Sequence, residues 1–190
     1  MKIGLFFGSF NPIHIGHLIL AQAVLDKAKL DKIWFVVSPQ NPFKVKSTLL
    51  HEFDRLDMVR AAIDDNPKFE ASDIEFNLEK PSYTVDTLAH LISKYPKHVF
   101  SLIMGEDNLE NLHKWKNAYY ILENHDVLVY PRPNAKPHSL ENTTKIKRID
   151  APMLDISASY IRNAIQKNQS IKYCVPDEVK VLVQSRGYYL

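Results

Sequence analysis

The start of the chain carries the feature that most restricts its fold, an unbroken apolar run at residues 3–7 that ends at Gly8. A run without any polar residue indicates a strand that is buried on both faces. Helical spacing of apolar residues begins at Ile15, and residues 9–12 in between include several turn-forming types. The stretch therefore predicts a strand, a tight turn and a helix, in that order.

The rest of the chain repeats this alternation of strand-like and helix-like segments. Further strands are expected at residues 32–38, 69–76, 99–104, 126–130 and 145–150, the last of them at a sheet edge. Further helices are expected at residues 52–64, 84–95, 109–124, 157–167 and 176–185. Such alternation is typical of an α/β fold with a mostly parallel sheet, in which ligands bind beyond the carboxyl ends of the strands. We expect one domain over residues 1–190, because the segment after the proline-rich stretch at 130–138 is too short to bury a core of its own.

The composition is that of an ordinary globular protein, and it narrows the range of partners. A net charge of +2 over 190 residues gives no support for binding to nucleic acid such as duplex DNA or to an anionic membrane. The single cysteine, Cys174, excludes an internal disulfide and fits a reducing compartment. No apolar run approaches the ~20 residues that span a bilayer. We therefore expect a cytoplasmic protein.

Two histidines, His14 and His17, lie at the start of the first predicted helix with a glycine between them. Their spacing of three residues places both rings on one side of the first helical turn. Free backbone N–H groups and the positive end of the helix dipole point the same way. Small turn residues, open amides and two imidazoles together predict a phosphate site. A purely structural role is the alternative, and it explains one histidine better than it explains two.

A second helix start carries Ser157, Ser159 and Arg162 within its first turn and a half. Hydroxyl groups, helix N–H groups and a guanidinium group can hold a second phosphate. The stretch fits a capped amphipathic helix with a solvated arginine equally well, so on its own it does not decide between the two.

Several familiar motifs are missing from the sequence. It has no P-loop, no glycine-rich dinucleotide fingerprint, no zinc-type cluster of cysteine and histidine, and no G-x-S-x-G elbow. Two anion sites without an obvious protein nucleophile suit a reaction in which one substrate brings its own nucleophile.

Residues 8–17, G-S-F-N-P-I-H-I-G-H, resemble the H-x-G-H signature of the nucleotidyltransferase superfamily, in the form found in bacterial nicotinate-mononucleotide adenylyltransferases. Residues 156–162, I-S-A-S-Y-I-R, resemble the I-S-x-[ST]-x-[IV]-R motif of the same superfamily, with Ala158 where many members carry serine. The family places this second motif opposite the first, across the nucleotide. The resemblance implies a Rossmann-like doubly wound sheet with helices on both faces and a C-terminal helical segment. It also implies adenylyl transfer from ATP to nicotinate mononucleotide, with release of pyrophosphate, in NAD biosynthesis.

The resemblance further implies roles for particular residues in the ATP half of the site. His14, His17 and Arg162 are the implied catalytic residues, which position the phosphates and neutralise their charge. A histidine beside phosphates has its charged form favoured, so we expect these rings to donate from both nitrogens. The implied ATP-binding residues are Gly8, Ser9, Phe10, His14, His17, Gly105, Asp107, Ile156, Ser157, Ser159 and Arg162. Mg²⁺ is the implied cofactor, held mainly by the ATP phosphates rather than by protein ligands.

For the mononucleotide, the resemblance points to Lys44, Ser82, Tyr83, Thr84, Trp115 and Arg132. Trp115 matches a tryptophan that the family stacks on the pyridine ring, and an aromatic face suits a flat cationic ring. The chain departs from the family pattern in two motifs. Phe43 stands where the N-P-x-K motif often has histidine, and it cannot donate a hydrogen bond. Glu106 stands where the G-x-D motif usually has a small residue, and its acid has to point away from the phosphates.

The sequence leaves two other functions open, a phosphopantetheine adenylyltransferase-like enzyme and a nucleotide-binding sensor without catalysis. The S-Y-T stretch at residues 82–84 and Trp115 favour the nicotinate enzyme over the first, and the intact phosphate residues speak against the second. The sequence does not decide between the acid and the amide of the mononucleotide, or whether the chain forms a homo-oligomer. Arg55 lies on a predicted helix, and a solvated face is one interpretation of its position.

Overall fold

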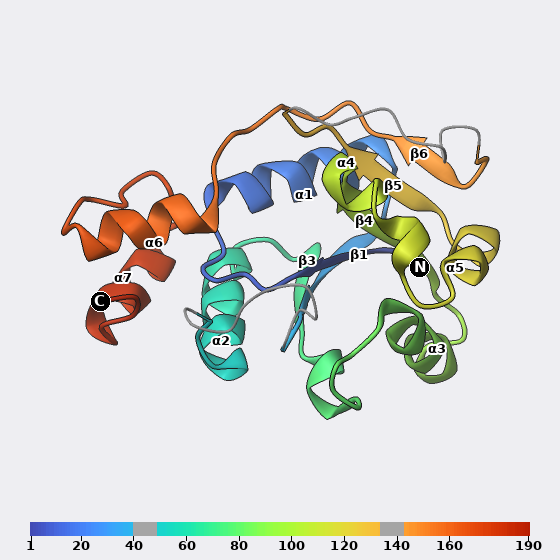
Figure 1. Cartoon of the computed structure of the whole chain (residues 1–190), viewed down its shortest axis with the longest axis horizontal. Helices are drawn as coiled ribbons and strands as arrows, with labels where there is room; N and C mark the ends of the chain where they lie inside the picture. The colour runs from blue at the N-terminus through green and yellow to red at the C-terminus, as the bar shows by residue number, and fades with distance from the viewer. Residues whose placement is uncertain (40–48, 134–142) are drawn as a thin grey trace.

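The computed structural model describes residues 1–39, 49–133 and 143–190 and has a central sheet with helices on both sides (Figure 1). The strands are β1 (Lys2–Gly8), β2 (Lys32–Val37), β3 (Phe69–Ser72), β4 (Val99–Gly105), β5 (Val127–Tyr130) and β6 (Ile146–Arg148). Neighbouring strands are parallel, in the order β3-β2-β1-β4-β5-β6, which places β6 at an edge as expected. This order confirms the predicted Rossmann-like doubly wound α/β fold.

Helices connect the strands and form the C-terminal segment that the sequence predicts. The α-helices are α1 (Ile15–Lys27), α2 (Glu52–Ile63), α3 (Thr84–Lys94), α4 (Glu106–Leu109), α5 (Ala118–Asn124), α6 (Ala158–Gln166) and α7 (Asp177–Ser185). Two short 3₁₀ helices are η1 (Ile74–Asn77) and η2 (Leu112–Lys114). Figure 1 shows α6 and α7 together at the end of the molecule that is remote from α3 and α5. None of the helices in the described part of the chain combines the length and the apolar character that crossing a bilayer requires.

The core lies in two layers, one on each face of the sheet. On β2, Phe35 belongs to the layer formed with α1, α2, α6 and α7, whereas Trp34 and Val36 belong to the layer formed with α3, α4, η2 and α5. The other central strands alternate in the same way, because successive side chains of a strand point to opposite faces. Burial on both faces explains why these strands are mostly apolar instead of alternating with polar residues.

The predicted strand at residues 69–76 is too long, because β3 ends at Ser72. The Ser72 hydroxyl accepts a hydrogen bond from the backbone N–H of Ile74 (3.4 Å), a local turn that competes with continued strand pairing. The chain then forms η1, which turns Glu75 into the interior.

The predicted helix at residues 109–124 is also wrong as a single element. The structure divides this stretch among α4, η2 and α5. Trp115 has an extended backbone, and Asn117 has a left-handed one with φ of 52°, so neither continues a helix. Asparagine tolerates this conformation better than most residues do. The break leaves Trp115 in a short connection instead of on a helix face.

The chain changes direction across the sheet between β1 and β4, which are neighbours although β2 and β3 come between them in sequence. Connections from these two strands run to opposite sides, so a crevice opens beyond their carboxyl ends. The loops after β1, β2 and β4 were the predicted places for a ligand. The site described next lies there.

Candidate functional site

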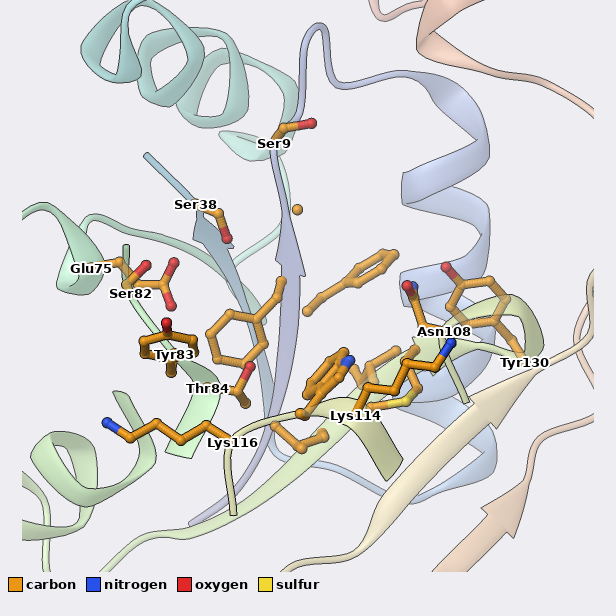
Figure 2. Close-up of a pocket in the computed structure, with 17 residues that line it drawn as sticks. Ser9, Ser38, Glu75, Ser82, Tyr83, Thr84, Asn108, Lys114, Lys116 and Tyr130 are labelled. Atoms are coloured by element: carbon orange, nitrogen blue, oxygen red, sulfur yellow. The ribbon is translucent and has the colours of Figure 1, made fainter. Parts of the chain in front are cut away.

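A pocket with a cavity of about 170 Å³ opens at the carboxyl end of the sheet, on the crevice between β1 and β4. All three predicted regions contribute to it, through Ser9 directly after β1, Ser38 directly after β2 and Asn108 of α4, which follows β4. Figure 2 shows two groups of polar side chains around this pocket, Glu75 with Ser82 and Tyr83 on one side and Asn108 with Lys114 and Tyr130 on the other.

Four of the six residues predicted for the mononucleotide form one wall of this pocket. Ser82, Tyr83 and Thr84 at the start of α3 line it together with Trp115 from the break between η2 and α5. Trp115 is half-buried, as its polar neighbours in the sequence suggested. Lys116 lies 4.9 Å from the centre of the Tyr83 ring and pairs with Asp86 of α3 (2.8 Å), which ties the two segments together.

His14 and His17 lie side by side at the start of α1, with ring centres 3.7 Å apart and planes inclined by 25°. Both rings therefore lie on the same side of the helix start, as predicted. The backbone N–H of His14 donates to Nδ1 of His17 (3.2 Å), so that this nitrogen is an acceptor and the neutral ring carries its proton on Nε2. The rings of Phe6 and Phe10 pack edge-on against His17. Since Phe6 also lines the pocket, His17 adjoins its edge.

His14 is buried, with 5% of its surface exposed. Burial, and to a smaller extent the charge of Arg132, lower the pKa of His14 to about 4. The ligand-free protein therefore holds His14 neutral at pH 7, and a neutral imidazole donates from one nitrogen. The expectation that both rings donate from both nitrogens concerns histidines beside bound phosphates, so it stays a prediction; without phosphates, desolvation holds His14 in its neutral form.

The low pKa of His14 makes stability depend on pH. Between pH 6.5 and pH 4 the unfolded chain binds a proton that the folded chain does not, so lowering the pH favours unfolding. We expect this group alone to cost roughly 2 kcal/mol of unfolding free energy between pH 7 and pH 5. Urea unfolding gives the unfolding free energy of the parent protein and of His14→Gln at both pH values. The effect of His14 is the loss between pH 7 and pH 5 in the parent protein minus the loss in His14→Gln. An equal loss of stability in the two proteins would contradict this assignment.

The second predicted motif meets the first in space. Nη1 of Arg162 donates to the backbone carbonyl of Asn11 in the turn before α1 (2.8 Å), across 151 positions of sequence. Ile156 packs so closely on Gly16 that a Cβ added at Gly16 would lie 2.5 Å from its Cγ2 atom. The glycine between the two histidines is therefore needed for the approach of the second motif.

The serine residues of this motif are engaged within α6. The Ser157 hydroxyl is the N-cap and accepts from the backbone N–H of Tyr160 (3.2 Å), and the Ser159 hydroxyl accepts from Nη2 of Arg162 (3.2 Å). Both hydroxyl groups keep a proton that can be donated to a phosphate oxygen. The capped-helix interpretation is thus correct for Ser157, but Arg162 is half-buried and held toward the first motif instead of being solvated.

The other predicted ATP-binding residues lie around the end of β4. Gly105 is the N-cap of α4, and Asp107 lies 3.7 Å from Nε of Arg132. Glu106 pairs with Arg148 of β6 and accepts from the backbone N–H of Arg132 (3.3 Å), so its charge is neutralised by the protein itself. Phe10 is buried, so only its backbone is available to a nucleotide.

Arg132, one of the residues predicted for the mononucleotide, is not among the described residues that line the Trp115 pocket. Arg132 follows β5, lies beside Asp107 and is close enough for its charge to act on His14. Arg132 thus lies near Asp107 and His14, two of the residues predicted to bind ATP. Lys44 and its neighbour Phe43 lie outside the described residues.

Arg55 is the residue whose place the sequence interpretation missed. It is fully buried, not solvated, and its guanidinium group donates to four backbone carbonyls, those of Ser9 (2.6 Å), Ser38 (2.8 Å), Pro39 (2.9 Å) and Leu50 (2.9 Å). The spacing in the sequence could have indicated that Arg55 is buried. Arg55 falls on the same face of α2 as the buried Val59 and Ala62, which follow at intervals of four and three residues.

The fold and the site together define a nucleotide-binding α/β protein of the nucleotidyltransferase class, with two helix starts facing one another beside a crevice. Residues 5–164 match the family model of the cytidylyltransferase-like proteins. A relative from Cytophaga hutchinsonii, named "Probable nicotinate-nucleotide adenylyltransferase", is 57% identical over 100% of this chain and 98% of its own length. A relative of the same name from Flavobacterium johnsoniae is 53% identical over 100% and 99%. The chain belongs to the nicotinate-nucleotide adenylyltransferase family, within the cytidylyltransferase-like proteins.

A solved structure supports the fold independently. The nicotinic acid mononucleotide adenylyltransferase of Plasmodium falciparum, complexed with NaAD, superposes with a TM-score of 0.84 over 99% of this chain and 97% of its own, at 20% identity.

Proposed function

We propose that the protein joins nicotinate mononucleotide to the adenylyl group of ATP, forming nicotinate adenine dinucleotide and pyrophosphate. The observation that carries the proposal is the meeting of the two helix starts, with His14 and His17 at one and Arg162 at the other, next to a pocket walled by Trp115. The names of the relatives support the same activity. The proposal needs no nucleic-acid or membrane partner.

The start of α3 supports the acid over the amide as the mononucleotide. The first intrahelical hydrogen bonds of α3 are donated by Asp86 and Thr87 to the Tyr83 carbonyl (3.0 and 3.1 Å). The N–H groups of Thr84 and Val85 come before them and, as at any helix start, have no acceptor within the helix. Because this helix start lines the pocket, its open amides and positive dipole end favour a bound carboxylate.

The reaction asks the protein for positioning and charge neutralisation. The phosphate of the mononucleotide is largely ionised at neutral pH, since its second pKa is about 6. Its oxygen attacks the α-phosphorus of ATP, and the bond to the pyrophosphate oxygen breaks, so negative charge moves to the leaving group. No general base is needed. His17 donates from Nε2 to the phosphates, and Arg162, Ser157 and Ser159 hold the departing pyrophosphate through charged and hydroxyl donors.

Mg²⁺ is proposed to enter with the phosphates of ATP. The described residues contain no group of three or more histidine, cysteine, aspartate or glutamate side chains that could hold a metal ion. The donor set therefore fits an ion ligated mainly by phosphate oxygens and water, which adds positive charge where the pyrophosphate leaves.

Pyrophosphate release tests the proposed function. ATP is supplied with nicotinate mononucleotide, with nicotinamide mononucleotide or with phosphopantetheine. We expect release with the first, weaker release with the second and none with the third. Release with phosphopantetheine alone would favour the related enzyme that the sequence left open, and tight ATP binding without any release would favour a sensor.

Trp115→Ala is expected to raise the KM for the mononucleotide about tenfold, because loss of a stacked aromatic face on a cationic ring removes roughly 1–2 kcal/mol of binding. The KM for ATP should stay within about twofold, since binding of the two substrates is separated along the crevice. Steady-state kinetics with each substrate varied in turn measures both values. Trp115→Phe keeps an aromatic ring and serves as the matched control, which should recover most of the loss. Equal increases in both KM values would show that Trp115 is structural.

A further inference from the structure

Glu75 is a buried carboxyl group that the proposed reaction does not use. Only 2% of its surface is exposed, although it belongs to the lining of the pocket. A buried carboxylate is costly unless it is paired or hydrogen-bonded. Among the interactions of the described residues, its side-chain partners are hydroxyl groups, and none is a cation.

The hydroxyl groups around Glu75 come from three different segments. The Thr87 hydroxyl, on α3, donates to its Oε1 atom (2.8 Å) and is itself fully buried. The hydroxyl groups of Ser38, after β2, and Ser82, before α3, line the same pocket and, like that of Thr87, favour the ionised form of the Glu75 carboxyl group. Figure 2 shows Ser82 next to Glu75, with Ser38 beyond them on the same side of the pocket. The Glu75 carboxyl group thus lies between the end of β2 and the start of α3, the helix that forms one wall of the pocket.

This arrangement decides which groups of α3 face a ligand. Hydroxyl protons that are directed at Glu75 are not directed into the pocket. Thr87 lies one turn inside α3 and also contacts the Tyr83 carbonyl (3.3 Å), so the bond to Glu75 fixes the first turn of the helix against η1. The amides of Thr84 and Val85 then remain as the donors at this wall. Burial raises the pKa of Glu75, and the three hydroxyl groups oppose that rise, which is the balance expected for an acid retained inside a site.

We propose that Glu75 is a positioning residue for the mononucleotide, which holds the start of α3 with its amides turned toward the bound acid. The inference rests on the proposed function and adds a determinant of substrate affinity to it. In this role Glu75 acts on the mononucleotide through its bond to Thr87, since its own carboxyl group is almost fully covered. Its effect should therefore fall on the mononucleotide and spare ATP, whose phosphates lie at the two other helix starts.

The test compares Glu75→Gln with Asp73→Asn, which removes one negative charge at an exposed position two residues away. We expect Glu75→Gln to raise the KM for nicotinate mononucleotide roughly tenfold, the effect of about one lost charged hydrogen bond, with kcat and the KM for ATP within about twofold. Asp73→Asn should leave all three values unchanged. An unchanged KM for the mononucleotide in a folded Glu75→Gln protein would overturn the inference, as would equal increases in both KM values.

Thr87 gives a second test that does not depend on the folding of the Glu75 variant. Thr87→Val keeps the shape of the side chain and removes the donor, so it should raise the same KM, and Thr87→Ser should restore it. Combining Glu75→Gln with Thr87→Val should raise the KM by much less than the product of the single effects, because both break one interaction. Multiplicative effects would contradict the inference. Absence of turnover in the parent protein would instead overturn the proposed function, so the two failures are distinguishable.

Discussion

His17→Ala is expected to lower kcat about 10²- to 10³-fold, the loss typical of one donor that stabilises developing negative charge. The structure assigns the donor to one atom. Nδ1 of His17 accepts from the backbone N–H of His14, so Nε2 is the atom that carries the proton toward the phosphates. Circular dichroism and urea unfolding should show an intact fold, and initial-rate kinetics at saturating ATP and mononucleotide measures the loss. Near-normal turnover of a folded His17→Ala protein would refute the assignment.

Two further variants of His17 separate its role as an acceptor from its role as a donor. His17→Asn keeps an acceptor near the position of Nδ1 and has no group at Nε2, so it should retain the bond from the His14 backbone and still lose kcat. His17→Gln carries an amide nitrogen that reaches about as far as Nε2, so it should recover part of the rate. The opposite order of activity would mean that the bond to His14, and thus the shape of the turn, is what matters.

Much of the fold follows from local patterns in the sequence. The apolar runs at residues 3–7 and 33–37, which became most of β1 and β2, have no polar residue to offer to solvent, and only a sheet covered on both faces buries them. The paired histidines and the Ser157 cap were also visible, because their meaning depends on residues within one helical turn. The two misjudged elements, residues 69–76 and 109–124, fail where a local turn at Ser72 and a left-handed Asn117 override apolar periodicity.

The remaining features depend on contacts between distant segments, which a linear pattern does not contain. The bond between Arg162 and the Asn11 carbonyl joins the two ends of the chain. Tyr189, one residue from the C-terminus, donates to the Asn11 side chain (3.0 Å), which also accepts from the backbone N–H of Leu50 (3.2 Å). The low pKa of His14 has the same origin, since it depends on burial by the whole fold and not on neighbours in sequence.

Arg55→Leu should be the most destabilising single substitution among those considered, with a loss of roughly 3–5 kcal/mol of unfolding free energy. Leucine fills part of the volume of Arg55 but leaves the carbonyls of Ser9, Ser38, Pro39 and Leu50 without their donors. Each carbonyl that stays buried and unpaired costs about 1–3 kcal/mol, and partial access of water limits the sum. Urea unfolding at pH 7 measures the change.

Arg60→Leu is the matched control, because Arg60 lies on the same helix with 58% of its side chain exposed and only a 4.0 Å contact to Asp57. It should change stability by less than about 0.5 kcal/mol. Arg55→Lys should fall between the two, since one ammonium group cannot reach carbonyls that the planar guanidinium group reaches from three nitrogens. Equal stability of the Arg55→Leu and Arg60→Leu proteins would show that water replaces the lost donors.

The position of Arg55 also links this stability to the site. Its Nη1 atom holds the carbonyls of Ser9 and Ser38 together, and these two residues directly follow β1 and β2 and line the pocket. A folded Arg55→Lys protein should therefore bind both substrates more weakly, unlike Glu75→Gln, which is expected to affect the mononucleotide alone. The contrast follows from the geometry, because Arg55 fixes the floor that the substrates share, whereas Glu75 fixes one wall.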